Sequence, residues 1–187
     1  MVAIDLKTAK IASRTVIAGA KSLNDVAVDS EGGVYVSDMQ GDAIHFLKDG
    51  KAKVWVAGKD VPHPNGLLVH DDELVVAGWG EAVDPTTGAT KELGKLYAFD
   101  LKSKERIEIL RQPLGNLDGL ENDGSGGYYV SDYVAGKVYQ IGADGSAFLL
   151  LQGFQGAADI GVVESKGLLL VPRTDENTLT AYEIEKF

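Results

Sequence analysis

Four acidic or carboxamide side chains recur at similar places along the sequence: Asp25, Asn65, Asp118 and Asp159. Each stands at or just before the start of a short apolar segment. Carboxylate and carboxamide oxygens suit calcium, whereas zinc sites are typically built from nitrogen and sulfur ligands. If the fold brings them together, they repel one another unless a cation neutralises them. We therefore expect a divalent-metal site, with calcium favoured over zinc, at which the metal polarises a carbonyl group and a carboxylate activates water.

The competing explanation for these four residues is turn capping, because Asp and Asn side chains commonly accept hydrogen bonds from nearby backbone N–H groups. Glu121 is a further candidate oxygen donor. It lies three residues after Asp118 in the same predicted strand, where a buried glutamate is costly unless it is paired.

The elements that must position these residues are short strands in a fixed order. Asn65 lies 40 residues after Asp25, Asp118 53 residues after Asn65, and Asp159 41 residues after Asp118. A period of about 40 residues with four short strands is typical of a β-propeller blade. In the first period we expect strands near 25–28, 34–37, 43–47 and 54–57. The sequence thus predicts an all-β, single-domain propeller over residues 1–187, with about four blades that start near residues 22, 63, 116 and 157.

In a propeller the innermost strand of each blade begins beside the central channel, so the four recurring residues should converge there. The two ends of the chain are less regular. Residues 2–5 and 13–17 resemble the third and fourth strands of an earlier blade, and the last unit stops at its third strand, 179–184. Residues 13–17 could close a four-bladed ring by joining the last blade. We favour the other arrangement, the later part of a larger propeller, whose open edge would favour self-association.

The recurring segments also resemble a known family. The strings at 22–29 (SLNDVAVD), 64–67 (PNGL), 117–120 (LDGL) and 136–139 (GKVY) are similar to motifs of the gluconolactonase, senescence marker protein and luciferin-regenerating enzyme family, especially its bacterial sugar-lactone-lactonase-like branch. This resemblance spans nearly the whole chain. It implies a six-bladed propeller with calcium or zinc in its channel, hydrolysis of lactones or related esters, and the absence here of about two leading blades.

By the same resemblance, Asn65 and Asp118 are metal ligands, Asp118 is also the general base, and Asn24 contacts the substrate. Two departures bear on the activity. The family's third side-chain ligand is a glutamate that enters the first blade of the family's propeller, which this chain does not contain, and Ser22 replaces a substrate-binding arginine. The alternative is therefore a non-catalytic propeller that binds a small molecule or a protein at its channel face.

Two further residues could contact a ligand. The second repeat is longer than its neighbours between Gly78 and Gly94, and Trp79 in this segment could overhang the channel mouth and stack on a ligand; a surface flap is the alternative. His63 lies two residues before Asn65 and could act as an acid or base, although an ordinary loop histidine explains it as well.

The composition narrows the classes of partner. The 187 residues carry a net charge of -10, are 44% hydrophobic and include no cysteine. The acidic charge disfavours nucleic acid and anionic membranes, and disulfides and thiol nucleophiles are excluded. With no secretory signal and no long apolar run in the sequence given, we expect a soluble protein with a small-molecule ligand, and both periplasm and cytoplasm remain open.

Overall fold

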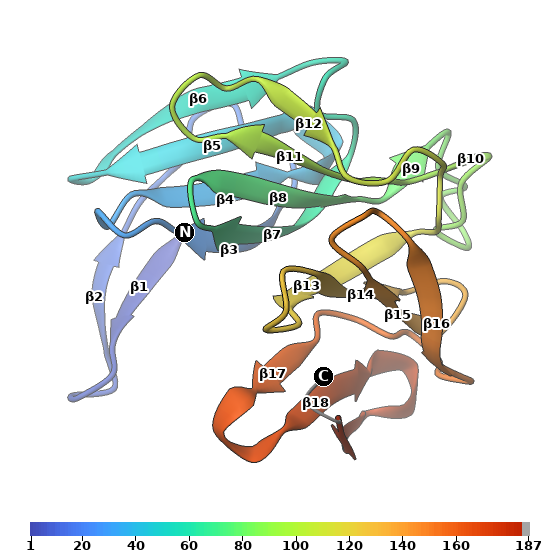
Figure 1. Ribbon diagram of the computed structural model, residues 1–187. Coiled ribbons are helices and arrows are strands. Elements are labelled where there is room, and N and C mark those ends of the chain that lie inside the picture. The colour runs from blue at the N-terminus through green and yellow to red at the C-terminus, as the bar shows by residue number, and fades with distance from the viewer. Residues whose placement is uncertain (185–187) are drawn as a thin grey trace.

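The structure is a computed structural model that describes residues 1–184, and it is an all-β propeller arrangement of four blades (Figure 1). Three blades are four-stranded antiparallel sheets. The first consists of β3 (Leu23–Val28), β4 (Val34–Asp38), β5 (Ala43–Lys48) and β6 (Lys51–Ala57). The second consists of β7 (Pro64–His70), β8 (Glu73–Gly78), β11 (Leu96–Asp100) and β12 (Arg106–Glu108). The third consists of β13 (Leu117–Asn122), β14 (Tyr128–Asp132), β15 (Lys137–Ile141) and β16 (Ala147–Gln152).

The fourth blade has three strands within the described residues. It consists of β17 (Gly161–Val163), β18 (Leu168–Arg173) and β19 (Thr178–Glu183). Single 3₁₀ turns follow β4, β17 and β18 at Met39–Gly41, Glu164–Lys166 and Thr174–Glu176. No helix among residues 1–184 has the length and apolar character needed to cross a membrane.

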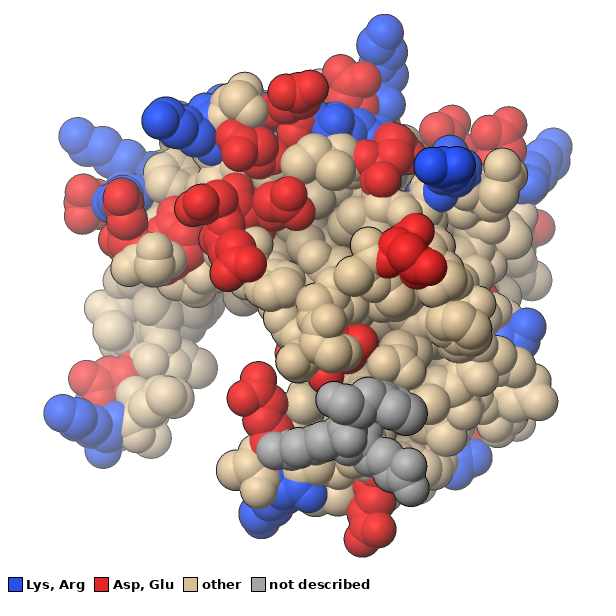
Figure 2. Space-filling model, in the orientation of Figure 1, with Lys and Arg blue, Asp and Glu red and all other residues tan. Residues whose placement is uncertain are grey.

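The N-terminal segment forms a separate hairpin of β1 (Val2–Asp5) and β2 (Lys10–Arg14). This hairpin projects from the first blade, and an open side separates it from the fourth blade (Figures 1 and 2). Within the described residues, β2 pairs with β1 and β19 pairs with β18 alone. The strand predicted at 13–17 therefore lies earlier, at 10–14, and does not close a ring on the last blade.

The hydrophobic core lies between neighbouring blades. Between the first and second blades, aromatic rings pack edge to face, with the centroids of Tyr35 and Trp55 5.0 Å apart and those of Trp55 and Phe99 5.8 Å apart. Leu96, Leu117 and Val130 belong to the buried cluster at the next interface, and one further apolar cluster joins the third blade to the fourth. Successive side chains of each strand point to opposite faces of its sheet. Both faces of the middle blades are buried, because each face packs against a neighbouring blade.

The long repeat of the second blade inserts a small hairpin, β9 (Gly80–Glu81) and β10 (Glu92–Leu93), between β8 and β11. In Figure 1 this hairpin projects from the end of the second blade, away from β17.

Candidate functional site

Each of the first three blades has an irregularity near the start of its innermost strand. The pairing register shifts between Leu23 and Val26 in β3, between Pro64 and Leu67 in β7, and between Leu117 and Leu120 in β13. Bulges of this kind bend a strand and redirect its side chains. Asp25, Asn65 and Asp118 all lie within these irregular segments, which is why residues spaced about 40 to 50 apart present their side chains at the inner ends of the blades.

Two buried serines stabilise the bulges of the first and third blades from the neighbouring strand. The backbone N–H of Asp25 donates to Ser37 Oγ at 2.8 Å, and the N–H of Gly119 donates to Ser131 Oγ at 2.7 Å. Ser131 Oγ also donates to the carbonyl of Ala158, 2.8 Å away in the next blade. Both hydroxyls are engaged by the backbone, which supports a structural rather than a nucleophilic role for the repeated Ser-Asp pairs.

The glycines after Asn65 and Asp118 allow the innermost strands to approach one another closely. A Cβ atom on Gly66 would lie 2.0 Å from the carbonyl oxygen of Asp118, and one on Gly119 would lie 2.2 Å from the backbone nitrogen of Ile160. Only glycine fits such backbone-to-backbone contacts. Asn65, Asp118 and Asp159 are consequently held on adjacent, touching segments of three successive blades.

Asp25 connects the first blade to the second. Its Oδ2 accepts a hydrogen bond from the N–H of Leu67 at 2.7 Å, and its Oδ1 accepts one from the N–H of Val26 at 2.6 Å. The carboxylate therefore performs the capping role that was the alternative to metal binding. It does so both locally, through the N–H of Val26, and across a blade boundary, through the N–H of Leu67.

Asn65 is the most deeply buried of the four residues, with 1% of its surface exposed. Its Nδ2 donates to the carbonyl of Leu117 at 3.1 Å, which connects the second blade to the third. Its Oδ1 is buried and has no hydrogen-bond partner among the described residues. An unpaired buried acceptor costs about 1–3 kcal/mol. This oxygen is therefore available to a cation or to a donor group.

The carboxyl groups at the inner ends of the blades raise one another's pKa values. Burial, together with the smaller effects of the charges of Asp159 and Asp25, raises the pKa of Asp118 to about 7, and the nearby Asn65 carboxamide opposes the shift. Burial and Asp159 likewise raise the pKa of Asp25 to about 6, against the hydrogen bond from Leu67. Partial burial raises the pKa of Asp159, which is the most exposed of the three. A cation would relieve this mutual repulsion.

A cavity of about 240 Å³ opens between the innermost strands, and Asp25, Glu121 and Asp159 supply its polar lining. Burial and the charges of Asp159 and Asp25 raise the pKa of Glu121. Asn65 and Asp118 lie beside this group without lining the cavity. Among residues 1–184, no three Asp, Glu or His side chains converge closely enough to form a ready-made metal site. Asn65 Oδ1 and the repelling carboxyl groups nevertheless have the donor chemistry that a hard cation requires.

None of the three predicted ligand-contacting residues lines this cavity. Asn24 is exposed on β3, with Met39 Sδ 4.0 Å from its Nδ2. His63 Nδ1 lies 3.4 Å from Asp42 Oδ1 at the junction of the first two blades. Trp79 is only 8% exposed, because its Nε1 donates to the carbonyl of Gly88 at 2.9 Å and its ring packs against Tyr133. The inserted segment thus folds back over Trp79.

The repeated Ser-Asp pairs at 37–38 and 131–132 indicate turn chemistry rather than a nucleophile, but the sequence did not predict that these serines support bulges. The repeated string Val-Ser-Asp at 36–38 and 130–132 is the signal, and it places a small hydroxyl opposite the bulges of the first and third blades. The hydrogen bond from Leu67 to Asp25 has no such signal, because it joins backbone and side chain across 42 residues.

No family model and no curated protein matches this sequence. Several solved structures are similar in fold. A chain of a nidogen–laminin complex is 16% identical, with a TM-score of 0.79 over 98% of this chain and 67% of that one. A putative gluconolactonase is 17% identical, with a TM-score of 0.73 over 92% of this chain and 62% of that one. A gluconolactonase from Xanthomonas campestris is 18% identical, with a TM-score of 0.67 over 92% and 61%. The chain thus spans about two thirds of each neighbour, and the likeness shows the propeller fold.

Proposed function

We propose that this chain is a metal-dependent hydrolase of a lactone or related ester. The observation that carries the proposal is the buried, unpartnered Oδ1 of Asn65 beside Asp118, whose carboxyl pKa is raised to about 7. A buried oxygen without a donor and a carboxyl group that is costly to ionise are both stabilised by a cation. The gluconolactonase structures among the neighbours support the reaction class, since they share this fold.

In this proposal Asn65 and Asp118 hold the cation, and Asp25 and Asp159 add negative charge around it. The all-oxygen donor set favours calcium over zinc. When bound, the ion would supply Lewis-acid polarisation of the substrate carbonyl. Asp118 would accept a proton from the attacking water, because the cation would keep its carboxylate ionised. Asn24, His63 and Trp79 are the proposed substrate contacts, and Trp79 would serve only if the segment between Gly78 and Gly94 moved off its ring.

A second candidate function is a non-catalytic propeller that binds a small molecule or a protein at its channel face. The observation that favours it is the use of both Asp25 oxygens by backbone N–H groups, which leaves that carboxylate as a structural connector. The similar chain from a nidogen–laminin complex shows that this fold also occurs in a protein–protein complex. The two candidates differ in whether Asp118 is needed for turnover or only for stability.

The deciding experiment combines calcium binding with a lactone and aryl-ester screen on the full chain. We expect calcium to raise the melting temperature and to support hydrolysis. Asp118→Asn should lose at least about 100-fold in rate, as expected for removal of a general base. Asp71→Asn is the matched control, because Asp71 is an exposed carboxylate in the turn after β7 and its side chain is 92% accessible. Calcium binding without hydrolysis of any substrate would favour the binding protein, and equal rates in both variants would overturn the catalytic role of Asp118.

A further inference from the structure

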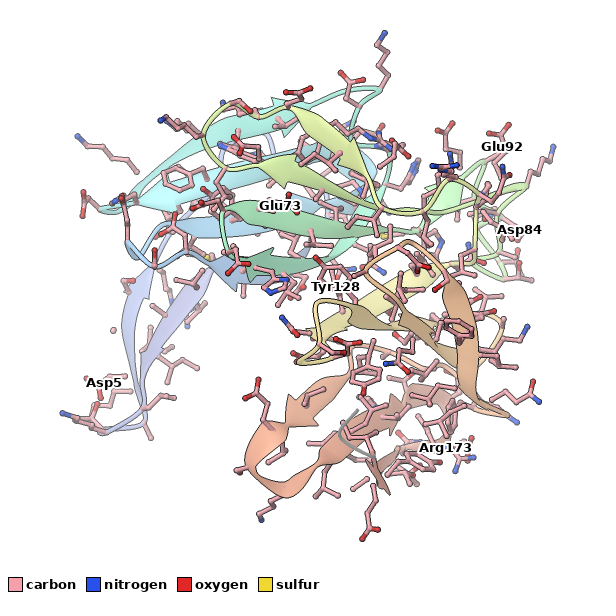
Figure 3. The ribbon with its side chains drawn as sticks, viewed as in Figure 1. Asp5, Glu73, Asp84, Glu92, Tyr128 and Arg173 are labelled. Carbon is pink, nitrogen blue, oxygen red and sulfur yellow. The ribbon has the colours of Figure 1, made fainter. Side chains whose placement is uncertain are left out.

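A cavity outside the candidate site has a volume of about 520 Å³ and lies beside the inserted segment of the second blade. Its walls come from the connection between the first two blades, from the inserted segment and from strands β11 and β12. Glu92, labelled in Figure 3, marks the inserted side of this region. The volume falls within the range of small-molecule binding sites.

The lining of this cavity is basic although the protein is acidic. Four of its side chains are cationic and two, Glu81 and Glu92, are anionic; the cationic ones are Lys59, Lys91, Lys95 and Arg106. Glu108 partly neutralises two of them, since its carboxylate oxygens lie 2.7 Å from Arg106 Nε and 3.9 Å from Lys95 Nζ. Within the described residues, Lys59 and Lys91 form no ion pair. With Glu108 counted, four cations face three carboxylates, so the cavity keeps a positive excess of one charge in a chain of net charge -10, and this excess favours an anion.

Tyr97 supplies an unsatisfied hydrogen-bonding group to the same cavity. The residue lines the cavity, is only 1% exposed, and has a hydroxyl without a partner among the described residues. Its ring lies 4.0 Å from the Arg106 guanidinium carbon. Buried hydroxyls normally find a partner, because an unpaired one loses its hydration without compensation. The hydroxyl can therefore donate to a ligand acceptor held near Arg106.

Close backbone contacts make the base of the cavity rigid. A Cβ atom on Gly94 would lie 1.7 Å from the carbonyl oxygen of Gly78, so both ends of the inserted segment meet where only glycine fits. Asn116 Nδ2 donates to the carbonyl of Trp79 and to Thr90 Oγ1, each at 2.8 Å, and fastens the inserted segment to the third blade. These contacts fix the base of the cavity, and a ligand reaches the buried Tyr97 hydroxyl when the side chains that cover it move aside.

We propose that this cavity binds a small anion that carries a carboxylate or phosphate group. Arg106, Lys95, Lys59 and Lys91 attract the anion, and the Tyr97 hydroxyl donates a hydrogen bond to one of its oxygens. Water could also accept a hydrogen bond from the Tyr97 hydroxyl, but a neutral water molecule would not balance the excess positive charge of the lining. The site shares no residue with the proposed hydrolase centre, so it does not depend on that function.

The test is isothermal titration of the full chain with inorganic phosphate and with succinate, at constant ionic strength, with glucose as a neutral control. We expect one or both anions to bind and glucose not to bind. Tyr97→Phe should weaken the binding about tenfold by removing one hydrogen bond to a charged group, and Lys91→Gln should weaken it several-fold. Lys48→Gln is the matched control, because Lys48 is a partly exposed lysine of the first blade that pairs with Glu31.

Binding of phosphate alone or of succinate alone would support the proposal and identify the preferred group. Tyr97→Phe should also melt at a higher temperature than wild type without any anion, because it removes the unpaired hydroxyl. The proposal is overturned if neither anion binds at concentrations on the order of 10 mM, or if a folded Tyr97→Phe variant binds as well as wild type. Asp118→Asn should retain the anion binding. The anion-binding result therefore does not depend on whether the hydrolase proposal holds.

Discussion

Asn65 is the residue on which the proposed cation site depends most directly. Its Oδ1 is buried without a partner among the described residues, and its Nδ2 holds the neighbouring blade through Leu117. Asn65→Ala should therefore abolish the rise in melting temperature that we expect calcium to cause. It should also destabilise the metal-free protein by about 1–3 kcal/mol, because the carbonyl of Leu117 loses its donor. Thermal melts with calcium and with chelator measure both effects, and an undiminished calcium shift in Asn65→Ala would remove Asn65 from the site.

The raised pKa of Asp118 predicts that the stability of the protein depends on pH. The pKa of Asp118 is raised to about 7 and that of Asp25 to about 6, from 3.8 in an unperturbed carboxyl group. Between about pH 4 and pH 7 the folded chain therefore binds protons that the unfolded chain has released. These groups make the free energy of unfolding fall as the pH rises through that window, by up to about 1.4 kcal/mol per pH unit for each proton.

Asp118→Asn isolates this contribution, because the amide cannot ionise. Urea unfolding in chelator at several pH values should give a variant that is relatively more stable than wild type at about pH 8 than at about pH 4. Asp71→Asn, at an exposed site, should follow the wild-type curve. Parallel curves for Asp118→Asn and wild type would show that Asp118 ionises normally in the folded protein.

At the scale of the element, the bulge near the start of the innermost strand in each of the first three blades directs side chains that lie about 40 to 50 residues apart toward the inner ends of the blades. The strands predicted for the first period at 34–37, 43–47 and 54–57 are confirmed as β4, β5 and β6, because alternating apolar residues between Gly and Asp turns specify short strands well. The bulges themselves were not predicted. They depend on pairing with the next strand and on hydroxyls such as Ser131, which are set by cross-strand contacts rather than by local pattern.

At the same scale, substitution of Gly119 tests the close contact between the third and fourth blades. A Cβ atom there would clash with the backbone of Asp159 and Ile160 in the next blade, whereas one on Gly161 would meet nothing within 4 Å. Gly119→Ala should therefore destabilise the protein by about 1–3 kcal/mol as an overpacked contact, and Gly161→Ala should be nearly neutral. Chemical denaturation of the two variants measures the difference. Equal stabilities would mean that the third and fourth blades do not touch at Gly119.

At the scale of the whole molecule, several edge strands of the described chain expose apolar side chains, and two of these edges lie near its two ends. The β1–β2 hairpin exposes Ile4 and Leu6, at 58% and 93%, and β19 ends the fourth blade with Leu179 64% exposed. Open, apolar edges favour pairing with a second chain. The interpretation that these blades are the later part of a six-bladed propeller stays a prediction. The self-association that we expected from an open edge likewise stays a proposal, argued from these exposed residues.

Light scattering of the full chain over a range of concentrations tests that proposal. We expect the apparent mass to rise with concentration, and we expect Leu179→Lys or Ile4→Lys to suppress the rise by placing a charge on the edge. Val134→Lys is the control, because Val134 is 41% exposed in the turn between β14 and β15. A monomer at all concentrations, or equal suppression by Val134→Lys, would contradict pairing through these edges.

The sequence by itself determined the all-β class, the blade period and the recurrence of Asp25, Asn65, Asp118 and Asp159, because strand alternation and turn chemistry are local properties. Only the tertiary structure decided what these residues do at the blade boundaries. It showed that Asp25 accepts the Leu67 N–H, that Asn65 keeps a buried oxygen unpaired among the described residues, and that burial and like charge hold the pKa of Asp118 near neutrality. These properties depend on contacts between residues about 40 to 50 positions apart, and on desolvation that exists only once neighbouring blades have packed.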